Sequence, residues 1–238
     1  MTSAPAAERL RELAARFALP AQAPGLLQRL LAILAEDPLA PTAVRAVDEA
    51  VDVHVADSLV ALDLPRVRQA GAIADLGAGA GLPGLVLAVA LPRAHVWLVE
   101  SNGRKRAFLS RTIADLGLPN AQAVHARVEA WAAGTGACDV VTARALAPLN
   151  VLVEYAAPLL REGGSLVAWK GRRDTTEEAD AVVAATATGL ESAGTRRVRP
   201  WPLAENRHLH LYVKVRSTPN RYPRRPGMAS KRPLRAST

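Results

Sequence analysis

Ala74-Asp75-Leu76-Gly77-Ala78-Gly79-Ala80-Gly81-Leu82-Pro83-Gly84 is the stretch of the chain that decides its fold. It joins a short apolar run at 72–76 to a helical pattern at 83–91. Glycines at such a junction permit a tight turn and let the backbone approach a ligand closely, and the helix start adds N–H donors. The stretch therefore predicts a strand–loop–helix unit that binds a nucleotide-like ligand. The simpler alternative is that the glycines only make the turn.

Short apolar runs alternate with helical patterns on the C-terminal side of this loop. The alternation predicts an α/β, Rossmann-like fold with a mostly parallel seven-stranded sheet and helices on both faces. The period-two run at 208–215 favours an antiparallel edge strand. Strands are expected at 72–76, 95–99, 121–125, 139–142, 165–169, 196–201 and 208–215, and helices at 83–91, 103–117, 128–133, 148–161 and 176–190.

The regions on either side of this pattern differ from it and from each other. Apolar residues at three- and four-residue steps predict helices at 8–18, 24–36 and 42–61. The chain therefore divides into an N-terminal helical extension (1–64), a main domain (65–215) and a tail (216–238). Proline interleaved with Arg and Lys predicts that the tail is disordered or extended.

The net charge of +8 lies almost entirely at the C-terminal end, where residues 214–238 carry eight Lys or Arg and no acid. A basic arm on a neutral body indicates a polyanionic partner, although a merely solubilising tail is the alternative.

Composition excludes several classes of protein. The single cysteine, Cys138, rules out an internal disulfide and a multi-cysteine zinc site, so no metal is expected and a reducing, cytoplasmic setting fits. The N-terminus lacks the apolar region of a signal peptide. The apolar stretch at 82–92 is too short to cross a bilayer, so we expect no membrane partner.

Two acidic residues near the glycine loop favour one nucleotide-like ligand over another. Glu100 ends the second predicted strand, where it can accept hydrogen bonds from ribose hydroxyls. Asp75 stands inside the end of the first strand, which suits a ligand with an ammonium group and suits a pyrophosphate poorly. S-adenosylmethionine (AdoMet) is therefore the predicted cofactor. A nicotinamide-dependent reductase is the alternative.

Several motifs occur in a fixed order and spacing over about 50–215. They are His54-Val55-Ala56-Asp57-Ser58-Leu59, the glycine loop, Glu100-Ser101-Asn102-Gly103-Arg104-Lys105-Arg106-Ala107-Phe108-Leu109, Ala126-Arg127-Val128-Glu129, Ala143-Arg144-Ala145-Leu146-Ala147-Pro148-Leu149, Trp169-Lys170-Gly171 and Arg207-His208-Leu209. In these motifs the chain resembles the RsmG family, also called glucose-inhibited division protein B, and its basic tail resembles the actinobacterial-type members. The chain lacks that family's Trp-Asn and Asn-Leu-Thr stretch at 30–50, and Val53 stands where Arg is common.

The resemblance implies a class I methyltransferase fold and an AdoMet-dependent enzyme that methylates N7 of a guanosine in 16S ribosomal RNA. Its partner would be that RNA or the immature small ribosomal subunit, and we expect a monomer. Another RNA, a small molecule, or RNA binding without catalysis are the alternatives. The resemblance places Gly77 and Leu82 at the methionine end of AdoMet, Val128 and Glu129 near adenine, and Arg144 between cofactor and substrate. The predicted cofactor-binding set is Asp75, Gly77, Gly79, Gly81, Leu82, Glu100, Val128, Glu129 and Arg144.

The chemistry of the implied reaction needs no catalytic acid or base. Guanine N7 has a free lone pair and loses no proton on methylation, so the enzyme has only to position the reactants. Arg144 could donate to guanine O6 or to a phosphate, and Lys170 could hold a phosphate. The alternatives are an ordinary salt bridge for Arg144 and a solvated strand end for Lys170. Cys138 precedes the fourth strand, at the wrong end to act as a nucleophile.

Overall fold

The computed structural model describes residues 4–236. Its N-terminal part is helical, as predicted, and a continuous helical stretch leads from Val47 to the main domain. This third helix begins later than the predicted residue 42, because the Thr42 hydroxyl bonds to the Val44 N–H and to His54 instead of capping a helix. The elements are α1 Ala4–Phe17, α2 Ala23–Glu36, α3 Val47–Ala50, a π-helical turn Val51–Ala56, α4 Asp57–Leu59, a 3₁₀ turn Val60–Asp63 and α5 Pro65–Arg68.

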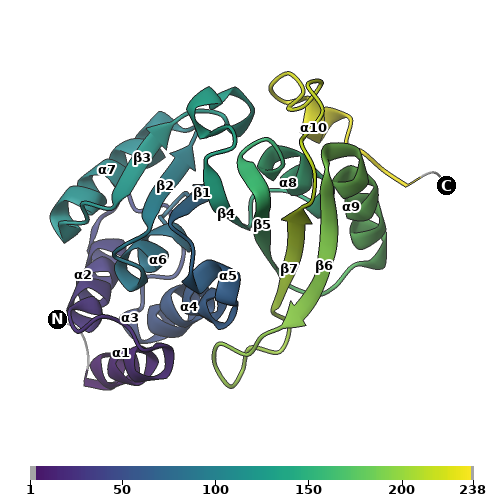
Figure 1. Ribbon diagram of the computed structural model, residues 1–238. Coiled ribbons are helices and arrows are strands. Elements are labelled where there is room, and N and C mark those ends of the chain that lie inside the picture. The colour runs from purple at the N-terminus through teal and green to yellow at the C-terminus, as the bar shows by residue number, and fades with distance from the viewer. Residues whose placement is uncertain (1–3, 237–238) are drawn as a thin grey trace.

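The main domain confirms the predicted seven-stranded, mostly parallel sheet (Figure 1). The strand order is β3-β2-β1-β4-β5-β7-β6, and β7 runs opposite to the other six strands. The elements are β1 Ala72–Leu76, α6 Gly84–Ala90, β2 His95–Glu100, α7 Gly103–Leu116, β3 Ala121–His125, β4 Cys138–Arg144, α8 Leu149–Ala156, β5 Leu160–Lys170, α9 Thr175–Thr188, β6 Leu190–Arg197 and β7 His208–Lys214.

Several details of the main domain differ from the prediction. The helix expected at 148–161 ends at Ala156, and β5 begins at Leu160 instead of 165. The period-two strand β7 is antiparallel but lies between β5 and β6, so the edge strand is β6. β6 begins at Leu190, before the predicted residue 196. The pattern does not predict this part of the strand, because most of β6 is exposed and carries no apolar alternation. The expected helix at 128–133 is a pair of 3₁₀ turns, Val128–Ala130 and Ala132–Gly134.

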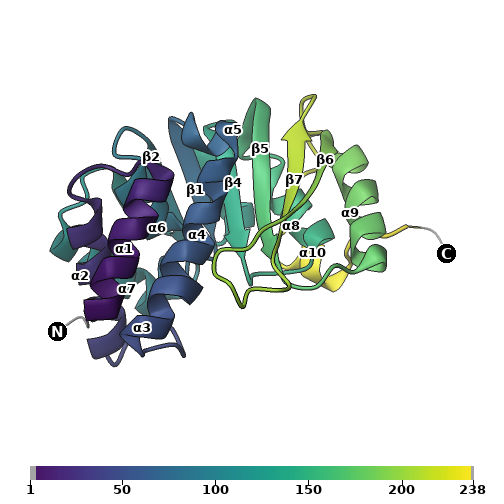
Figure 2. The ribbon, with the colours of Figure 1, turned by 90° about the horizontal axis from the view of Figure 1, so that it is seen from below.

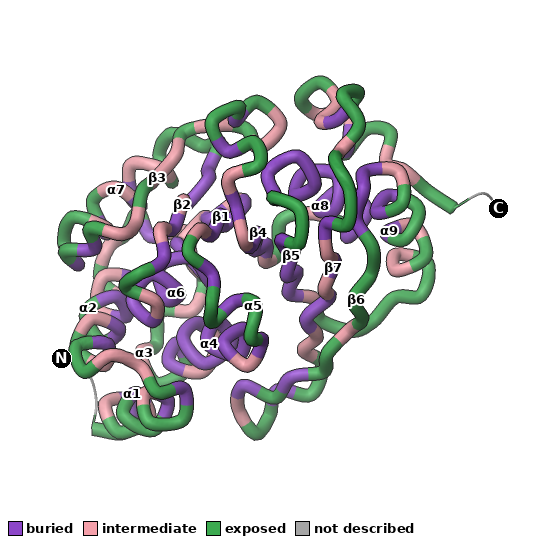
Figure 3. The backbone as a smooth tube through the Cα atoms, viewed as in Figure 1, coloured by how far each residue is buried: buried purple, intermediate pink, exposed green. Residues whose placement is uncertain are grey.

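Helices cover both faces of the sheet, as the alternation predicts (Figure 2). The N-terminal helices, α6 and α7 pack on one face through a core that includes Ile73 and Val96. Helices α8 and α9 pack on the other face through Ala74 and Val141. Burial is densest in the central strands and in α6, whose residues are all buried (Figure 3). No helix in the described part of the chain is long and apolar enough to cross a membrane.

The predicted disordered tail is instead an ordered part of the molecule as far as residue 236; residues 1–3, 237 and 238 lie outside the described range. Residues 217–236, the C-terminal segment, run from the sheet to α8, and the short helix α10 (Met228–Lys231) lies against α8 (Figure 1). Ala229 is buried there. An ion pair and several hydrogen bonds hold the segment, and such contacts have no signature in hydrophobic periodicity.

Candidate active site

The glycine loop follows β1 and uses most of its own N–H groups internally. Gly77, Gly79 and Gly81 have φ values of +63°, +54° and +88°, which explains the need for glycine at each. The N–H groups of Gly77 and Ala78 donate to the Val99 carbonyl, and the Gly79 N–H donates to Glu100 Oε2 at 3.1 Å. Few loop donors therefore remain for a pyrophosphate, which weighs against a dinucleotide.

Asp75 is buried behind the loop. Its Oδ2 accepts the Gly84 N–H at the start of α6 at 2.9 Å, and its Oδ1 accepts the Thr142 hydroxyl at 2.8 Å. Burial raises the pKa of Asp75 to about 6, against the lowering effect of these two hydrogen bonds and of Arg144. Asp75 lines neither of the cavities described below, and its two hydrogen bonds join the end of β1 to the start of α6 and to β4.

The glycines of the loop serve two different purposes. A Cβ on Gly77 would lie 2.5 Å from Leu146 Cδ1, at the mouth of a cavity. A Cβ on Gly81 would collide with Leu85 of α6, so that glycine permits helix–loop packing. Leu82 is also buried, and neither it nor Gly81 lines the cavity. The structure therefore brings Gly77 to the ligand side and leaves Gly81 and Leu82 in packing positions.

A cavity of about 240 Å³ opens above the carboxyl ends of β1 to β4. It brings together four of the predicted cofactor residues, Gly77, Glu100, Val128 and Glu129. The Glu100 carboxylate is 7 % exposed and also accepts the Asn102 N–H at 2.8 Å, so its position is fixed. We call this the cofactor cavity. The other lining residues are Val99, Ser101, Lys105, Ala126, Arg127, Ala145, Leu146 and Tyr155.

The donor set of the cofactor cavity fits AdoMet. A fixed carboxylate stands where a ribose can donate hydrogen bonds, and Val99, Val128 and Leu146 supply an apolar lining for a purine ring. A second carboxylate, Glu129, accepts the Gly227 N–H at 2.8 Å. Burial alone would raise the pKa of Glu129, but this hydrogen bond and Arg127 hold it below its usual value, so the group is ionised.

A second cavity, of about 440 Å³, adjoins the first, since Ala145 lines both. Ala145 has a φ of +55°, an uncommon value for a residue with a side chain. Arg144 and Lys170, the predicted substrate-positioning residues, both line this cavity, which we call the substrate cavity. Arg144 lies here and not in the cofactor cavity. The other lining residues are Val53, His54, Asp57, Trp169, Gly171 and Arg207.

Arg144 is held in place by the N-terminal extension. Its Nη1 donates to Asp57 Oδ2 at 2.9 Å and to the Val53 carbonyl at 3.2 Å. Asp57 is itself fixed, because its carbonyl accepts the Trp169 indole N–H at 2.8 Å and Arg207 Nε lies 3.4 Å from its Oδ1. The salt bridge considered for Arg144 thus exists. Since both contacts use Nη1, the rest of the guanidinium is left for a ligand.

Asp57 is the functional residue that sequence reasoning missed. It lies in the motif His54-Val55-Ala56-Asp57-Ser58-Leu59, where the resemblance assigns no role to the acid. His54 bonds to Thr42 Oγ1 through Nε2 at 3.0 Å, and burial and Arg144 lower its pKa. His54 is therefore a neutral, hydrogen-bonding wall residue.

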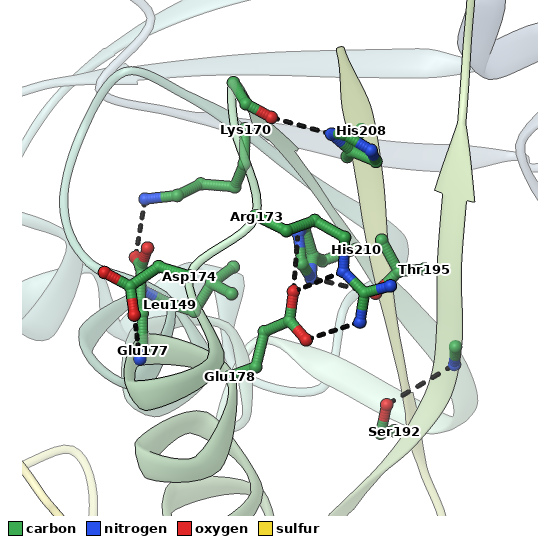
Figure 4. Close-up of polar contacts among 12 residues, drawn as sticks. Leu149, Lys170, Arg173, Asp174, Glu177, Glu178, Ser192, Thr195, His208 and His210 are labelled. Carbon is green, nitrogen blue, oxygen red and sulfur yellow. Dashed lines mark hydrogen bonds and ion pairs between the residues drawn. The ribbon is translucent and has the colours of Figure 1, made fainter. Parts of the chain in front are cut away.

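Lys170 ends β5 and makes an ion pair with α9 (Figure 4). Its Nζ lies 2.6 Å from Glu177 Oε1, which also accepts the Leu149 N–H at the start of α8 at 2.7 Å. His208 bonds to the Gly171 carbonyl at 2.7 Å beside it. Lys170 therefore ties β5 to α8 and α9 at the rim of the substrate cavity, and the solvated strand end considered for it is replaced by this network.

The single cysteine lies away from both cavities. Cys138 is buried at the start of β4, far along the strand from Arg144, and burial raises the pKa of its thiol to about 12. It has none of the thiolate character that a nucleophile needs. Among the described residues, no group of three or more His, Cys, Asp or Glu side chains could hold a metal ion.

Solved structures share the fold of this chain. A variant of the 16S rRNA (adenine(1408)-N(1))-methyltransferase from Catenulisporales acidiphilia is similar with a TM-score of 0.53 and 18 % identity, over 65 % of this chain and 90 % of that one. A predicted O-methyltransferase from Agrobacterium tumefaciens is similar with a TM-score of 0.51 and 26 % identity, over 68 % and 80 %. The fold is thus the class I methyltransferase fold.

Sequence comparison identifies the family. The family model described as GidB, rRNA small subunit methyltransferase G, matches residues 26–199. A ribosomal RNA small subunit methyltransferase G from Rubrobacter xylanophilus is 44 % identical over 188 residues, 76 % of this chain and 72 % of the relative. One from Desulfitobacterium hafniense is 39 % identical over 81 % of both chains. The chain therefore belongs to the rRNA small subunit methyltransferase G family, a family of AdoMet-dependent enzymes that act on small-subunit ribosomal RNA.

Proposed function

We propose that this enzyme methylates N7 of a guanosine in 16S ribosomal RNA, with AdoMet in the cofactor cavity and the target base in the substrate cavity. The observation that carries the proposal is that the two cavities meet at Ala145, with a fixed carboxylate in one and a fixed guanidinium in the other. Glu100 would hold the ribose, Val128 and Glu129 the adenine side, and Gly77 the methionine end. Gly79 acts through its N–H on Glu100, and Asp75, Gly81 and Leu82 shape the loop.

When bound, AdoMet supplies a methyl group that its sulfonium already activates. Guanine N7 loses no proton in accepting it, so this chain has only to orient the base and exclude water. Arg144 is suited to orient guanine, because Asp57 and Val53 fix one of its nitrogens and the others can donate to O6. The neutral His54 completes the wall without competing for a proton.

The surface beside the site supports an RNA substrate. The C-terminal segment presents exposed Arg221, Arg225, Lys231, Arg232 and Arg235. Cations on one surface bind the phosphate backbone with an affinity that falls as salt rises. We propose that these side chains contact 16S RNA or the immature small subunit, and that Lys170 contacts RNA at the cavity rim only after leaving Glu177.

We also propose three properties on more general grounds. The chain acts as a monomer. It works in the cytoplasm, where the ribosomal RNA is. The basic C-terminal segment favours an actinobacterial-type member of the family.

The experiment that tests this function is methyl transfer from labelled AdoMet to small-subunit particles that lack the modification, followed by mapping of the methylated nucleotide. The expected result is one labelled guanosine, modified at N7, and no label on transfer RNA or on free nucleotides. Glu100→Ala should weaken AdoMet binding, whereas Arg144→Gln should impair transfer with AdoMet binding intact. Label on an exocyclic amine, or on another RNA, would refute the proposal.

A further inference from the structure

The C-terminal segment contacts the wall of the cofactor cavity. Residues 217–236 lie beyond the part of the chain that the family model matches, which ends at residue 199. The segment nonetheless reaches α8 and the 3₁₀ turn after β3, two elements that supply residues to the cavity (Figure 1).

A buried ion pair anchors the segment to α8. Arg224 Nε lies 2.7 Å from Glu154 Oε1, and Arg224 Nη2 lies 2.5 Å from Glu154 Oε2. The Glu154 side chain is 1 % exposed. A carboxylate buried to this degree is strongly unfavourable without its partner, so the folded chain keeps the segment docked. Arg224 Nη1 also donates to the Arg232 carbonyl at 2.8 Å, which closes the segment on itself.

Beyond the anchor, the segment holds two residues that line the cofactor cavity. The Gly227 N–H donates to Glu129 Oε1 at 2.8 Å, and Ser230 Oγ lies 3.2 Å from the Tyr155 hydroxyl. Tyr155 directly follows Glu154 in α8, so the ion pair fixes the backbone that carries the tyrosine. Gly227 has a φ of +84°, which aims its N–H at Glu129 in a conformation that favours glycine.

We propose that the C-terminal segment is a working part of the AdoMet site, and that Arg224 and Gly227 are positioning residues. Arg224 acts through Glu154 on Tyr155, and Gly227 acts on Glu129. The proposal rests on the assignment of the cofactor cavity to AdoMet. A site whose wall is held in advance loses less conformational freedom on binding, so the docked segment strengthens AdoMet binding. The segment is therefore docked on the site and is not the free arm that its composition suggests.

The test is AdoMet binding and turnover by a chain that ends at Thr218 and carries Glu154→Gln, which avoids an unpaired buried carboxylate. We expect the calorimetric dissociation constant for AdoMet, measured without RNA, and the KM for AdoMet to rise about tenfold. Calorimetry without RNA reports on the cofactor site alone, because the truncation also removes the cations proposed to contact RNA. Full-length Gly227→Pro, which removes the N–H that Glu129 accepts and cannot adopt the φ of +84°, should raise the KM for AdoMet severalfold and avoids truncation.

Two controls make the result decisive. Full-length Arg93→Gln, which removes an exposed cation outside the segment, should leave AdoMet affinity unchanged. Glu100→Ala tests the assignment of the cavity, because a normal AdoMet affinity in that variant would defeat the proposed function itself. If Glu100→Ala weakens binding while Gly227→Pro, or the folded truncated chain, binds AdoMet within twofold of the parent, the inference about the segment is wrong.

Discussion

Two segments outside the sheet each contribute one side chain to an ion pair at the site, and they do so in opposite ways. The N-terminal extension supplies the acid, Asp57, to a base on the sheet, Arg144. The C-terminal segment supplies the base, Arg224, to an acid on α8, Glu154. The first pair borders the substrate cavity and the second supports the cofactor cavity. Under the proposed function, the two segments therefore serve different reactants.

The two segments also pack by different physical means. Leu10, Leu13, Leu27 and Leu31 bury the N-terminal helices in a core shared with the sheet. In the C-terminal segment, burial of apolar side chains is limited to a few residues such as Ala229, and polar contacts do the rest. Hydrophobic burial is visible in sequence as periodicity, whereas docking through ion pairs and backbone N–H groups is not.

The largest expected effect concerns the ion pair between Arg144 and Asp57, which borders the substrate cavity. Arg144→Gln should lower kcat/KM for methyl transfer by about 10²- to 10³-fold, because it removes charged donors aimed at the base. The calorimetric affinity for AdoMet should stay within threefold of the parent. Arg207→Gln is the matched control, since Arg207 contacts the same carboxylate at a longer distance, and it should lose tenfold or less. A near-normal kcat/KM for Arg144→Gln would show that the ion pair of Arg144 with Asp57 does not serve the substrate, and its contrast with the pair of Arg224 and Glu154 would be lost.

Arg224→Ala tests the ion pair between Arg224 and Glu154 through the free energy of unfolding. It leaves Glu154 buried and unpaired, so urea unfolding should show a loss of about 3 kcal/mol or more. Adding Glu154→Gln should restore much of that loss, because the buried charge is then absent. If the single variant is as stable as the parent, the C-terminal segment is not anchored in the way described.

Asp75→Asn tests a residue of the glycine loop region, for comparison with the two outer segments. The measured quantity is the stability of the fold as a function of pH. Burial raises the pKa of Asp75 from 3.8 to about 6, so the folded chain favours the protonated form. The stability that Asp75 contributes is complete below pH 3.8 and is lost as pH rises through 6. At pH 8 the variant should therefore be more stable than the parent by up to about 3 kcal/mol, and near pH 4 by almost nothing.

The same variant also tests the positioning role of Asp75 in AdoMet binding. Asn can still accept the Gly84 N–H and can donate to the Thr142 hydroxyl. Calorimetry should show AdoMet affinity within a few-fold of the parent. A loss of a hundredfold would mean that the carboxylate contacts the cofactor directly.

The smallest expected effect concerns the exposed face of the C-terminal segment. Arg221→Gln with Arg225→Gln should weaken RNA binding severalfold at low salt and reduce the slope of log affinity against log salt by roughly one per charge removed. AdoMet affinity should be unchanged, because neither side chain contacts Glu129, Tyr155 or Glu154 in the described part of the chain. An unaltered salt slope would show that this face of the segment does not meet RNA.

Sequence alone determined the alternation of strands and helices, the glycine loop, Glu100 at the end of β2 and Arg144 at the end of β4. These follow from local rules, since periodicity reports burial and glycine reports tight turns. Tertiary structure decided what each residue contacts. In the fold, Asp75 accepts hydrogen bonds from Gly84 and Thr142. Arg144 forms an ion pair with Asp57, and Lys170 forms one with Glu177.

Tertiary structure also decided the place of β7 inside the sheet and the docking of the C-terminal segment. Such pairings join residues far apart in the chain, such as Glu154 with Arg224, and a polar side chain carries no local sign of its distant partner. The physical reason is that apolar burial imposes a repeating pattern along the sequence, whereas a charged or hydrogen-bonding group is satisfied by whichever partner the fold brings to it.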